Sequence, residues 1–148
     1  MAKVRIVYGS ETGNTESIAK MLSTEISAAG HEVTCESAAD VPAKNLAEGY
    51  DCVLLGASAW GTDTLELQSD FDEYSDEFSS MGLGGKKGAA FASGDTSYEY
   101  YCGAVDFIEE KFNEENVTIV AEGLRVEGDA SDGEDEIKAF AAAVVKAL

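Results

Sequence analysis

The sequence has few positive charges: 10 lysine and arginine residues stand against 29 aspartate and glutamate residues, which gives a formal net charge of −19. Nucleic acids and anionic membrane surfaces are therefore excluded as favourable partners, because like charges repel. Basic proteins are favoured as partners for the same reason. Solubility or adaptation to salt would explain part of this acidity, so the positions of the acidic residues decide its meaning.

Histidine and cysteine are also scarce. The chain has one histidine, His31, and its cysteines are Cys35, Cys52 and Cys102, with no C-x-x-C pair. This set argues against a zinc site, an iron–sulfur cluster and a disulfide framework, so we predict no metal site. The C-x-x-x-x-x-R pattern of cysteine phosphatases is absent, and no general acid–base pair is evident. We therefore predict no catalytic residue.

Long hydrophobic runs are missing. No stretch approaches the roughly 18 apolar residues that a membrane-spanning helix needs, and the chain passes from Met1-Ala2-Lys3 directly into an apolar segment, unlike a signal peptide. We expect a cytoplasmic protein without a membrane partner. At 148 residues the chain is long enough for one three-layer core, and no linker divides it, so one domain over residues 1–148 is predicted.

Two nucleotide-binding fingerprints are absent as well. The triphosphate pattern G-x-x-x-x-G-K-[ST] does not occur, and the dinucleotide pattern G-x-G-x-x-G is reduced to Gly9 and Gly13 after the first predicted strand. No lysine or arginine lies between Arg5 and Lys20 to neutralise a phosphate group. Triphosphate and pyrophosphate ligands are therefore disfavoured.

What the N-terminal segment does contain is an apolar strand followed by a loop of glycines and hydroxyls. Residues 3–15 read KVRIVYGSETGNT, and a helix is predicted from about Asn14. The start of a helix points unpaired N–H groups and its positive dipole end at such a loop. The hydroxyls of Ser10, Thr12 and Thr15 add neutral donors. This pattern predicts a pocket for the terminal phosphate of a mononucleotide, since a helix cap alone needs only one hydroxyl.

Strands and helices alternate along the rest of the chain. The predicted strands are 4–8, 32–36, 52–56, 87–92 and 117–121, and the predicted helices are 14–29, 40–47, 67–78, 101–113 and 135–148. Continuous apolar strands joined by helical crossovers indicate an α/β three-layer sandwich, with a five-stranded parallel sheet covered on both faces. In such folds the ligand lies beyond the carboxyl ends of the strands.

Aromatic residues lie in two of the loops predicted at that end of the sheet. The single tryptophan, Trp60, is placed in a loop among small residues after the third strand. Tyr98, Tyr100 and Tyr101 follow the fourth strand in a loop predicted to begin at Ser93. Each aromatic residue alone could have a structural role. Together with the phosphate loop they predict a flat ring held between aromatic faces.

The same residues carry a family resemblance. Residues 10–15 match the [ST]-x-T-G-x-T signature of flavodoxins, and residues 58–61 and 94–105 resemble the two flavin-flanking loops of short-chain flavodoxins typified by those of sulfate-reducing bacteria. The resemblance covers essentially all 148 residues. It implies the flavodoxin-like fold, for which flavodoxin itself is the type example of strand order 2-1-3-4-5. It also implies non-covalently bound FMN as the cofactor, and nothing suggests the long loop that interrupts the fifth strand of long-chain members.

The resemblance further assigns roles at the site. Trp60 would cover one face of the flavin ring and Tyr98 would stack on the other, while the Gly61 carbonyl would accept a hydrogen bond from flavin N5–H. Thr62 stands where some relatives carry aspartate. Phosphate would be held by Ser10, Thr12, Asn14, Thr15 and Ser58, and the pyrimidine end by backbone groups of Asp95, Tyr100 and Cys102. The full implied set is Ser10, Glu11, Thr12, Gly13, Asn14, Thr15, Ser58, Ala59, Trp60, Gly61, Thr62, Ser93, Gly94, Asp95, Tyr98, Tyr100 and Cys102.

By the same resemblance the chain is expected to be an electron-transfer protein and not an enzyme. It would carry single electrons at low potential, cycling mainly between the semiquinone and hydroquinone forms of FMN. The implied partners are reductases, hydrogenase-type or ferredoxin-accepting oxidoreductases and basic cytochromes, with the chain acting as a monomer. A flavodoxin-like NAD(P)H:quinone reductase is the alternative, and a specialised carrier that activates ribonucleotide reductase also stays open.

Overall fold

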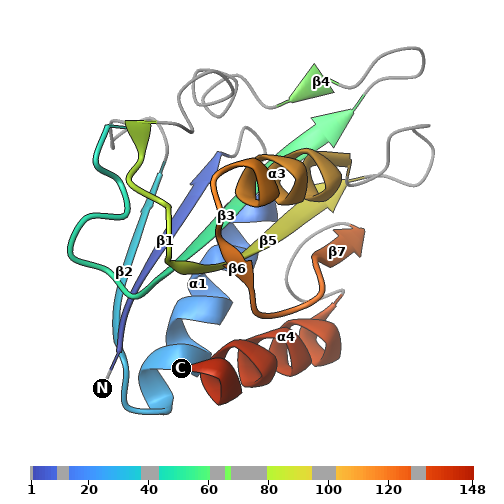
Figure 1. The fold of residues 1–148 in the computed structure, drawn as a ribbon. Coiled ribbons are helices and arrows are strands. Elements are labelled where there is room, and N and C mark those ends of the chain that lie inside the picture. Colours follow the sequence, from blue (N-terminus) through green and yellow to red (C-terminus); the bar gives the residue numbers. More distant parts are fainter. Residues whose placement is uncertain are drawn as a thin grey trace.

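The computed structural model describes residues 2–9, 14–37, 44–60, 66–67, 80–94, 103–127 and 133–148. Within these ranges, strands and helices alternate for most of the chain (Figure 1). The strands are β1 (Lys3–Gly9), β2 (Glu32–Ser37), β3 (Cys52–Trp60), β4 (Glu66–Leu67), β5 (Lys87–Gly94), β6 (Thr118–Ile119) and β7 (Leu124–Glu127). The helices are α1 (Asn14–Ala28), α3 (Gly103–Glu114) and α4 (Glu134–Ala147).

The strands form one sheet with the order β2-β1-β3-β5-β6, in which β7 also pairs with β5 and β4 pairs with β3. Every pair along this order is parallel, as is β5 with β7, whereas β4 runs antiparallel to β3. Because β6 and β7 together occupy the place of the fifth predicted strand, the predicted order 2-1-3-4-5 is confirmed. The predicted α/β sandwich is confirmed with it.

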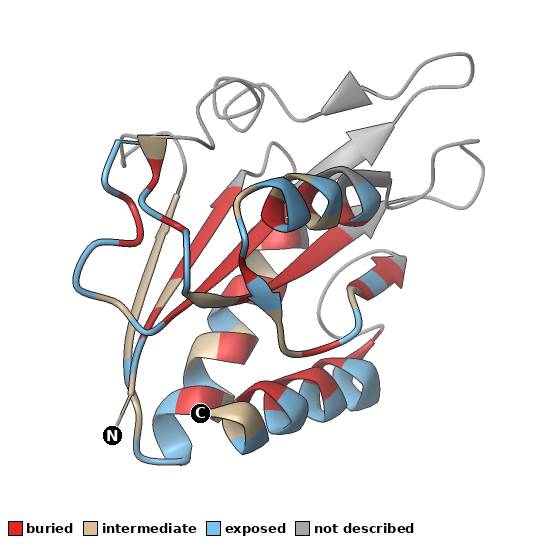
Figure 2. Ribbon diagram, in the orientation of Figure 1, coloured by how far each residue is buried: buried red, intermediate tan, exposed pale blue. Residues whose placement is uncertain are grey.

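The sheet is buried on both faces, as continuous apolar strands require. Helices α1 and α4 cover one face and α3 lies on the other (Figures 1 and 2). Neighbouring residues of a strand point to opposite faces, so each strand contributes to two cores. The core under α1 and α4 includes Ile6, Ile18, Leu22, Leu54, Phe91 and Phe140. The core under α3 includes Val7, Leu55, Ala90, Val105, Ile108 and Phe112.

The predicted helix over residues 40–47 is wrong in the part that the structure describes. Residues 44–49 form turns, and the backbone N–H groups of Asn45 and Ala47 donate to the carbonyls of Ser80 and Met81 over 2.8 Å each. These long-range bonds use donors that a helix would need. Asn45 also has a φ of 59°, which a regular helix does not accommodate. Residues 40–43 lie outside the described residues.

Predictions near the carboxyl ends of the strands need correction too. Trp60 was assigned to a loop, but β3 continues through it and pairs with β4. Ser93 and Gly94 likewise belong to β5. Leu67, expected at the start of a helix, lies in β4, and residues 68–78 of that predicted helix fall outside the described part of the chain.

The fifth predicted strand, at 117–121, is two strands. β6 ends at Ile119, residues 120–123 are not strand, and the chain returns to β5 as β7 at Leu124. The physical reason lies at Gly123, whose Cα packs so close to Val105 of α3 that a Cβ there would overlap the valine side chain. Regular pairing is broken where the chain is drawn towards α3.

None of the helices that the structure describes is both long and apolar enough to cross a membrane.

Candidate functional site

The carboxyl ends of three strands meet at one edge of the sheet. Gly9 at the end of β1 pairs with Ala57 of β3, and Ser58 of β3 pairs with Ser93 of β5. Helix α1 begins at Asn14, shortly after β1 ends, so the N-terminus of the helix lies at the same edge (Figure 1). Unpaired N–H groups and a positive dipole end are therefore directed at this edge. This is the arrangement that suits an anion.

The structure brings part of the predicted site together at this edge. The described members are Asn14, Thr15, Ser58, Ala59, Trp60, Ser93 and Gly94. The other predicted residues lie outside the described residues: Ser10, Glu11, Thr12, Gly13, Gly61, Thr62, Asp95, Tyr98, Tyr100 and Cys102. The assignment of both groups of residues to a cofactor site stays a prediction.

Thr15 is the one polar side chain recorded as fully buried among the described residues, with 0% exposure. It lies in the first turn of α1, next to the loop for which a phosphate was predicted. A buried hydroxyl is retained in a protein when it has a hydrogen-bonding role, because desolvating it otherwise costs free energy. Its place beside the helix N-terminus makes it suitable for a phosphate-binding site that is built from uncharged donors.

The first turns of α1 also show how nearby charges are arranged. The Tyr8 hydroxyl donates to Glu16 Oε1 over 3.3 Å, and the Lys20 ammonium lies 3.1 Å from the same carboxylate oxygen. The first lysine that follows the loop in sequence is thus engaged by Glu16. The described donors at this edge are the Thr15 hydroxyl and the backbone N–H groups at the start of α1. Such a donor set fits a single phosphate group better than a polyphosphate.

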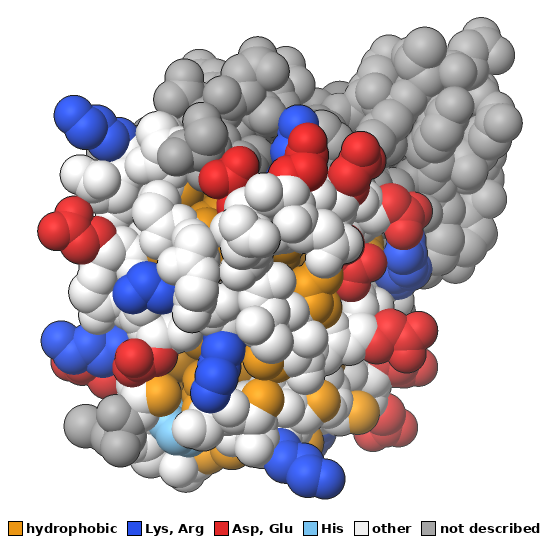
Figure 3. All heavy atoms as spheres, viewed as in Figure 1, with side chains coloured by type: hydrophobic (Ala, Val, Ile, Leu, Met, Phe, Trp, Pro, Cys, Tyr) orange, Lys and Arg blue, Asp and Glu red, His pale blue; other side chains and the backbone are white. Residues whose placement is uncertain are grey.

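The segments that surround the strand ends in sequence are acidic. Residues 9–15, 57–70 and 93–104 contain no lysine or arginine, but they include Glu11, Asp63, Glu66, Asp70, Asp95 and Glu99. The face in Figure 3 shows acidic side chains gathered along the side where α3 lies, with lysine and arginine more frequent towards the opposite side. Exposed acids of α3 include Asp106, Glu110 and Glu114.

The strand pair β3–β4 was not predicted from the sequence. Trp60 pairs with Glu66 and Ala59 with Leu67, so the backbone of Glu66 is held beside the tryptophan. The spacing of Leu67, Phe71 and later aromatic residues suggested a helix and hid this pairing. No local pattern marks a two-residue strand, and only the alternation of Trp60 with small neighbours hinted at an extended segment.

Two cysteines and the histidine lie away from this edge. Burial raises the pKa of the Cys52 thiol to about 12 and that of Cys35 to about 11. Both thiols therefore stay protonated near neutral pH and are poor nucleophiles. His31 lies in the turn after α1, where its Nδ1 accepts a hydrogen bond from the Ala2 N–H over 3.1 Å. Over the described ranges, no cluster of three or more metal-ligating side chains occurs.

Comparisons with known proteins place these features in context. The family model for flavodoxin matches residues 6–140. The chain is 45% identical over 148 residues to a flavodoxin of Nitratidesulfovibrio vulgaris, with 100% of both chains covered. It is 39% identical over 144 residues to a flavodoxin of Maridesulfovibrio salexigens, with 97% of each covered. Among solved structures, oxidised Flavodoxin 2 from Bacillus cereus matches with a TM-score of 0.90 and 38% identity, over 99% of this chain and 100% of that one.

Proposed function

The chain belongs to the flavodoxin family, and on this premise we propose that it carries single electrons at low potential between redox proteins. As a flavodoxin it is an FMN-binding electron-transfer protein and not an enzyme. The finer proposal is that residues 1–148 form one FMN-binding domain that works as a cytoplasmic monomer, cycling mainly between the semiquinone and hydroquinone forms of the cofactor. The observation that carries it is the meeting of the ends of β1, β3 and β5 beside the start of α1.

We assign the phosphate of FMN to the loop between β1 and α1. The buried Thr15 and the N-terminus of α1 support this assignment, because they offer neutral donors at a positive dipole end. Ser10, Thr12, Asn14 and Ser58 complete the proposed set. The engagement of Lys20 by Glu16 supports a cradle without a cation.

We assign the flavin ring to the space beyond the ends of β3 and β5. When bound, FMN supplies transfer of one or two electrons. Trp60 and Tyr98 would exclude water from the two faces of the ring, and backbone groups of Asp95, Tyr100 and Cys102 would bind its pyrimidine end. The Gly61 carbonyl would accept a hydrogen bond from the flavin N5–H, and glycine tolerates more than one backbone conformation at this position. The position of Trp60 at the end of β3 supports this placement.

The acidic residues around the edge would set the potential. A unit charge about 10 Å away costs an added negative charge roughly 1.7 kcal/mol at an effective dielectric near 20, which is about 70 mV for one electron. Water exclusion by the aromatic residues acts in the same direction, since it penalises an anion most. The second reduction step is therefore expected at low potential.

The partners proposed are redox proteins with basic docking faces, such as reductases, hydrogenase-type or ferredoxin-accepting oxidoreductases and basic cytochromes. The net charge of −19 supports this class, because an acidic rim attracts and orients a basic face. Association should weaken as salt increases, since screening shortens the range of these forces.

The experiment is a transfer assay with the FMN-loaded protein. It is reduced without oxygen and mixed with a basic c-type cytochrome at increasing ionic strength. Rapid cytochrome reduction that slows with salt supports the carrier. The rival quinone reductase predicts instead rapid oxidation of NADPH with a quinone acceptor, and that result, with slow cytochrome reduction, would overturn the proposal.

A further inference from the structure

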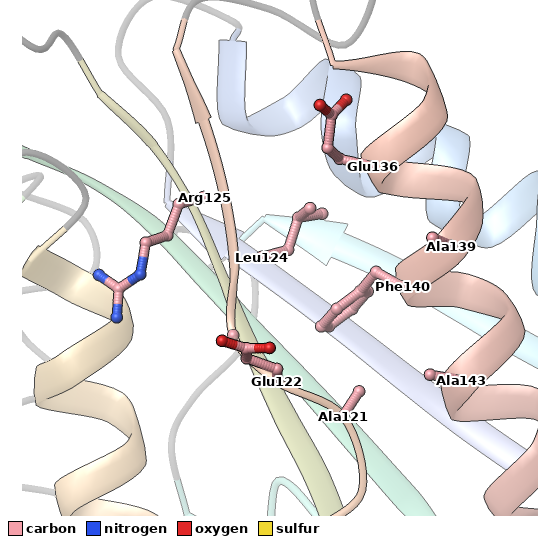
Figure 4. Close-up of a pocket in the computed structure, with 9 residues that line it drawn as sticks. Ala121, Glu122, Leu124, Arg125, Glu136, Ala139, Phe140 and Ala143 are labelled. Atoms are coloured by element: carbon pink, nitrogen blue, oxygen red, sulfur yellow. The ribbon is translucent and has the colours of Figure 1, made fainter.

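A groove lies between the interruption of the fifth strand and helix α4 (Figure 4). Its volume is about 450 Å³. Ala121 and Leu124 line it from the strand side, and Phe140 lines it from the helix. These three side chains are 8%, 5% and 5% exposed, so they form an apolar floor. The walls include Ala139 and Ala143, which are exposed on the same face of α4.

The groove exists because the chain leaves the sheet at this point. The Val120 N–H still donates to the Gly88 carbonyl over 3.0 Å, but pairing with β5 resumes only where Leu124 meets Phe91. Between them, Gly123 packs against Val105 of α3 so closely that a Cβ would overlap it. The chain is thereby held on the α3 side. On the α4 side, the short side chain of Ala121 leaves the groove open.

The mouth of the groove is acidic. Glu122 and Glu136 lie at its two ends and are both exposed (Figure 4). Arg125 also lines the groove, but Figure 4 shows its side chain directed towards α3, where a guanidinium nitrogen lies 2.7 Å from Asp106 Oδ1. That pairing offsets the charge of Arg125. An apolar floor with a negative rim is complementary to an apolar side chain flanked by positive charges.

The groove also lies close to the edge of the sheet where β1, β3 and β5 end, which we call the cofactor edge. β7 runs beside β5 from Leu124, opposite Phe91, to Glu127, opposite Gly94. Three residues of strand span roughly 10 Å. A protein that placed a side chain in the groove would therefore also reach the edge where β5 ends. A second copy of this chain is a poor occupant, because two molecules of net charge −19 repel each other.

We propose that this groove is a docking site for a redox partner, which inserts one apolar side chain flanked by lysine or arginine. The nature of the partner rests on the proposed function. The groove fixes the orientation of the partner on the α4 side of the cofactor edge, while the acidic rim attracts it from a distance. Docking thus combines a buried apolar anchor with a charged surround, as in other protein interfaces.

The test uses the full-length, FMN-loaded protein labelled with 15N, and a capped peptide of sequence Lys-Lys-Phe-Lys-Lys. A control peptide carries serine in place of phenylalanine. We expect amide shifts at residues 121–125 and 136–143, and an affinity for the phenylalanine peptide about tenfold or more above that for the serine peptide, in keeping with burial of an aromatic side chain. Equal affinities, or shifts confined to other surfaces, would overturn the proposal.

Variants in α4 supply matched controls. Ala143→Gln places a longer polar side chain in the groove and should lower affinity for the phenylalanine peptide to that for the serine peptide. Ala142→Gln makes the same change at the neighbouring exposed residue, which does not line the groove, and should leave affinity unchanged. Glu136→Gln should weaken binding of both peptides more than Asp135→Asn does. Equal losses for Ala142→Gln and Ala143→Gln would contradict a specific groove.

Two further results separate this proposal from the proposed function. Ultracentrifugation of the protein alone should show no self-association, and a dimer that Ala143→Gln dissociates would mean that a second copy occupies the groove. Ala143→Gln should also slow reduction of a basic cytochrome by the reduced protein at low salt, and an unchanged rate would overturn the assignment to a redox partner. If the carrier proposal itself is wrong, the result is different: the unsubstituted protein transfers no electrons to the cytochrome, although it still binds the phenylalanine peptide.

Discussion

Gly56→Ala should destabilise the protein through a single contact. Gly56 of β3 pairs with Phe91 of β5, and the buried phenylalanine ring covers the glycine so closely that an added Cβ would overlap three ring carbons. Forcing extra volume into a packed core costs about 1–3 kcal/mol. Loss of glycine's freedom in the unfolded chain offsets about 0.4–1 kcal/mol of this. The net expected loss in the free energy of unfolding is about 1–2 kcal/mol.

Urea unfolding followed by far-UV circular dichroism, at a fixed saturating concentration of FMN, measures this loss. The midpoint should fall with an unchanged slope, which indicates a change of stability without a change of surface exposed on unfolding. In a Phe91→Leu background, where the ring is gone, the same substitution should cost less than about 0.5 kcal/mol. Gly84→Ala is the matched control, because the nearest atom to its Cβ would be the Glu115 carbonyl oxygen at 3.6 Å. An identical cost in both backgrounds would refute the contact.

Three other changes test separate parts of the account. Burial raises the pKa of the Cys52 thiol from 9.0 to about 12, so between these pH values the thiol ionises in the unfolded state but not in the folded state, and stability falls as pH rises. Between pH 8 and pH 10, the free energy of unfolding measured with urea should therefore fall by about 1.4 kcal/mol less in Cys52→Ala than in the unsubstituted protein. Arg5→Met should cost about 1–3 kcal/mol in urea unfolding, because it removes donors 3.0 Å from the Leu46 carbonyl and 2.9 Å from Glu36; an unchanged midpoint would show that these bonds contribute nothing net. Tyr98→Ala should weaken FMN binding in a fluorescence titration and raise the potential of the second reduction step, and unchanged values would remove Tyr98 from the ring site.

Much of the fold could be predicted because its signals are local. The continuous apolar runs of β1, β3 and β5 indicated strands buried on both faces, and Gly30, with a φ of +97°, follows the end of α1. Ile18 and Leu22, four residues apart in the helix predicted over 14–29, are both fully buried. Alternation of strands and helices then restricts the topology to a parallel sheet. The strand order followed from the family resemblance.

The errors arose where contacts between distant residues override local pattern. The apolar residues 117–121 suggested one strand, but the packing of Gly123 against Val105 interrupts it, although the alternation at 124–126 was a signal for β7. Small residues around Trp60 suggested a loop, yet pairing with Glu66 extends β3 through the tryptophan. Bonds from Asn45 to Ser80 replaced the expected helix. None of these partners is near in sequence to the residue that it changes.

The site was predicted more from short sequence motifs than from the spacing of apolar residues. The loop of hydroxyls and glycines indicated a phosphate, and the structure brings the start of α1 to the ends of β1 and β3 as that reading requires. The identity of the ring and the roles of Trp60 and Tyr98 came from resemblance, because two aromatic residues in separate loops have no fixed spacing. The acidic residues of the predicted loops could be identified directly from the sequence.

The proposed function requires that this chain holds FMN and transfers electrons one at a time. The most direct measurement is stepwise reduction of the FMN-loaded protein without oxygen, with the visible spectrum recorded at each potential. We expect a stable one-electron intermediate with long-wavelength absorption, followed by a second step at clearly lower potential. Direct bleaching in one two-electron step would contradict the one-electron carrier and favour a flavin reductase.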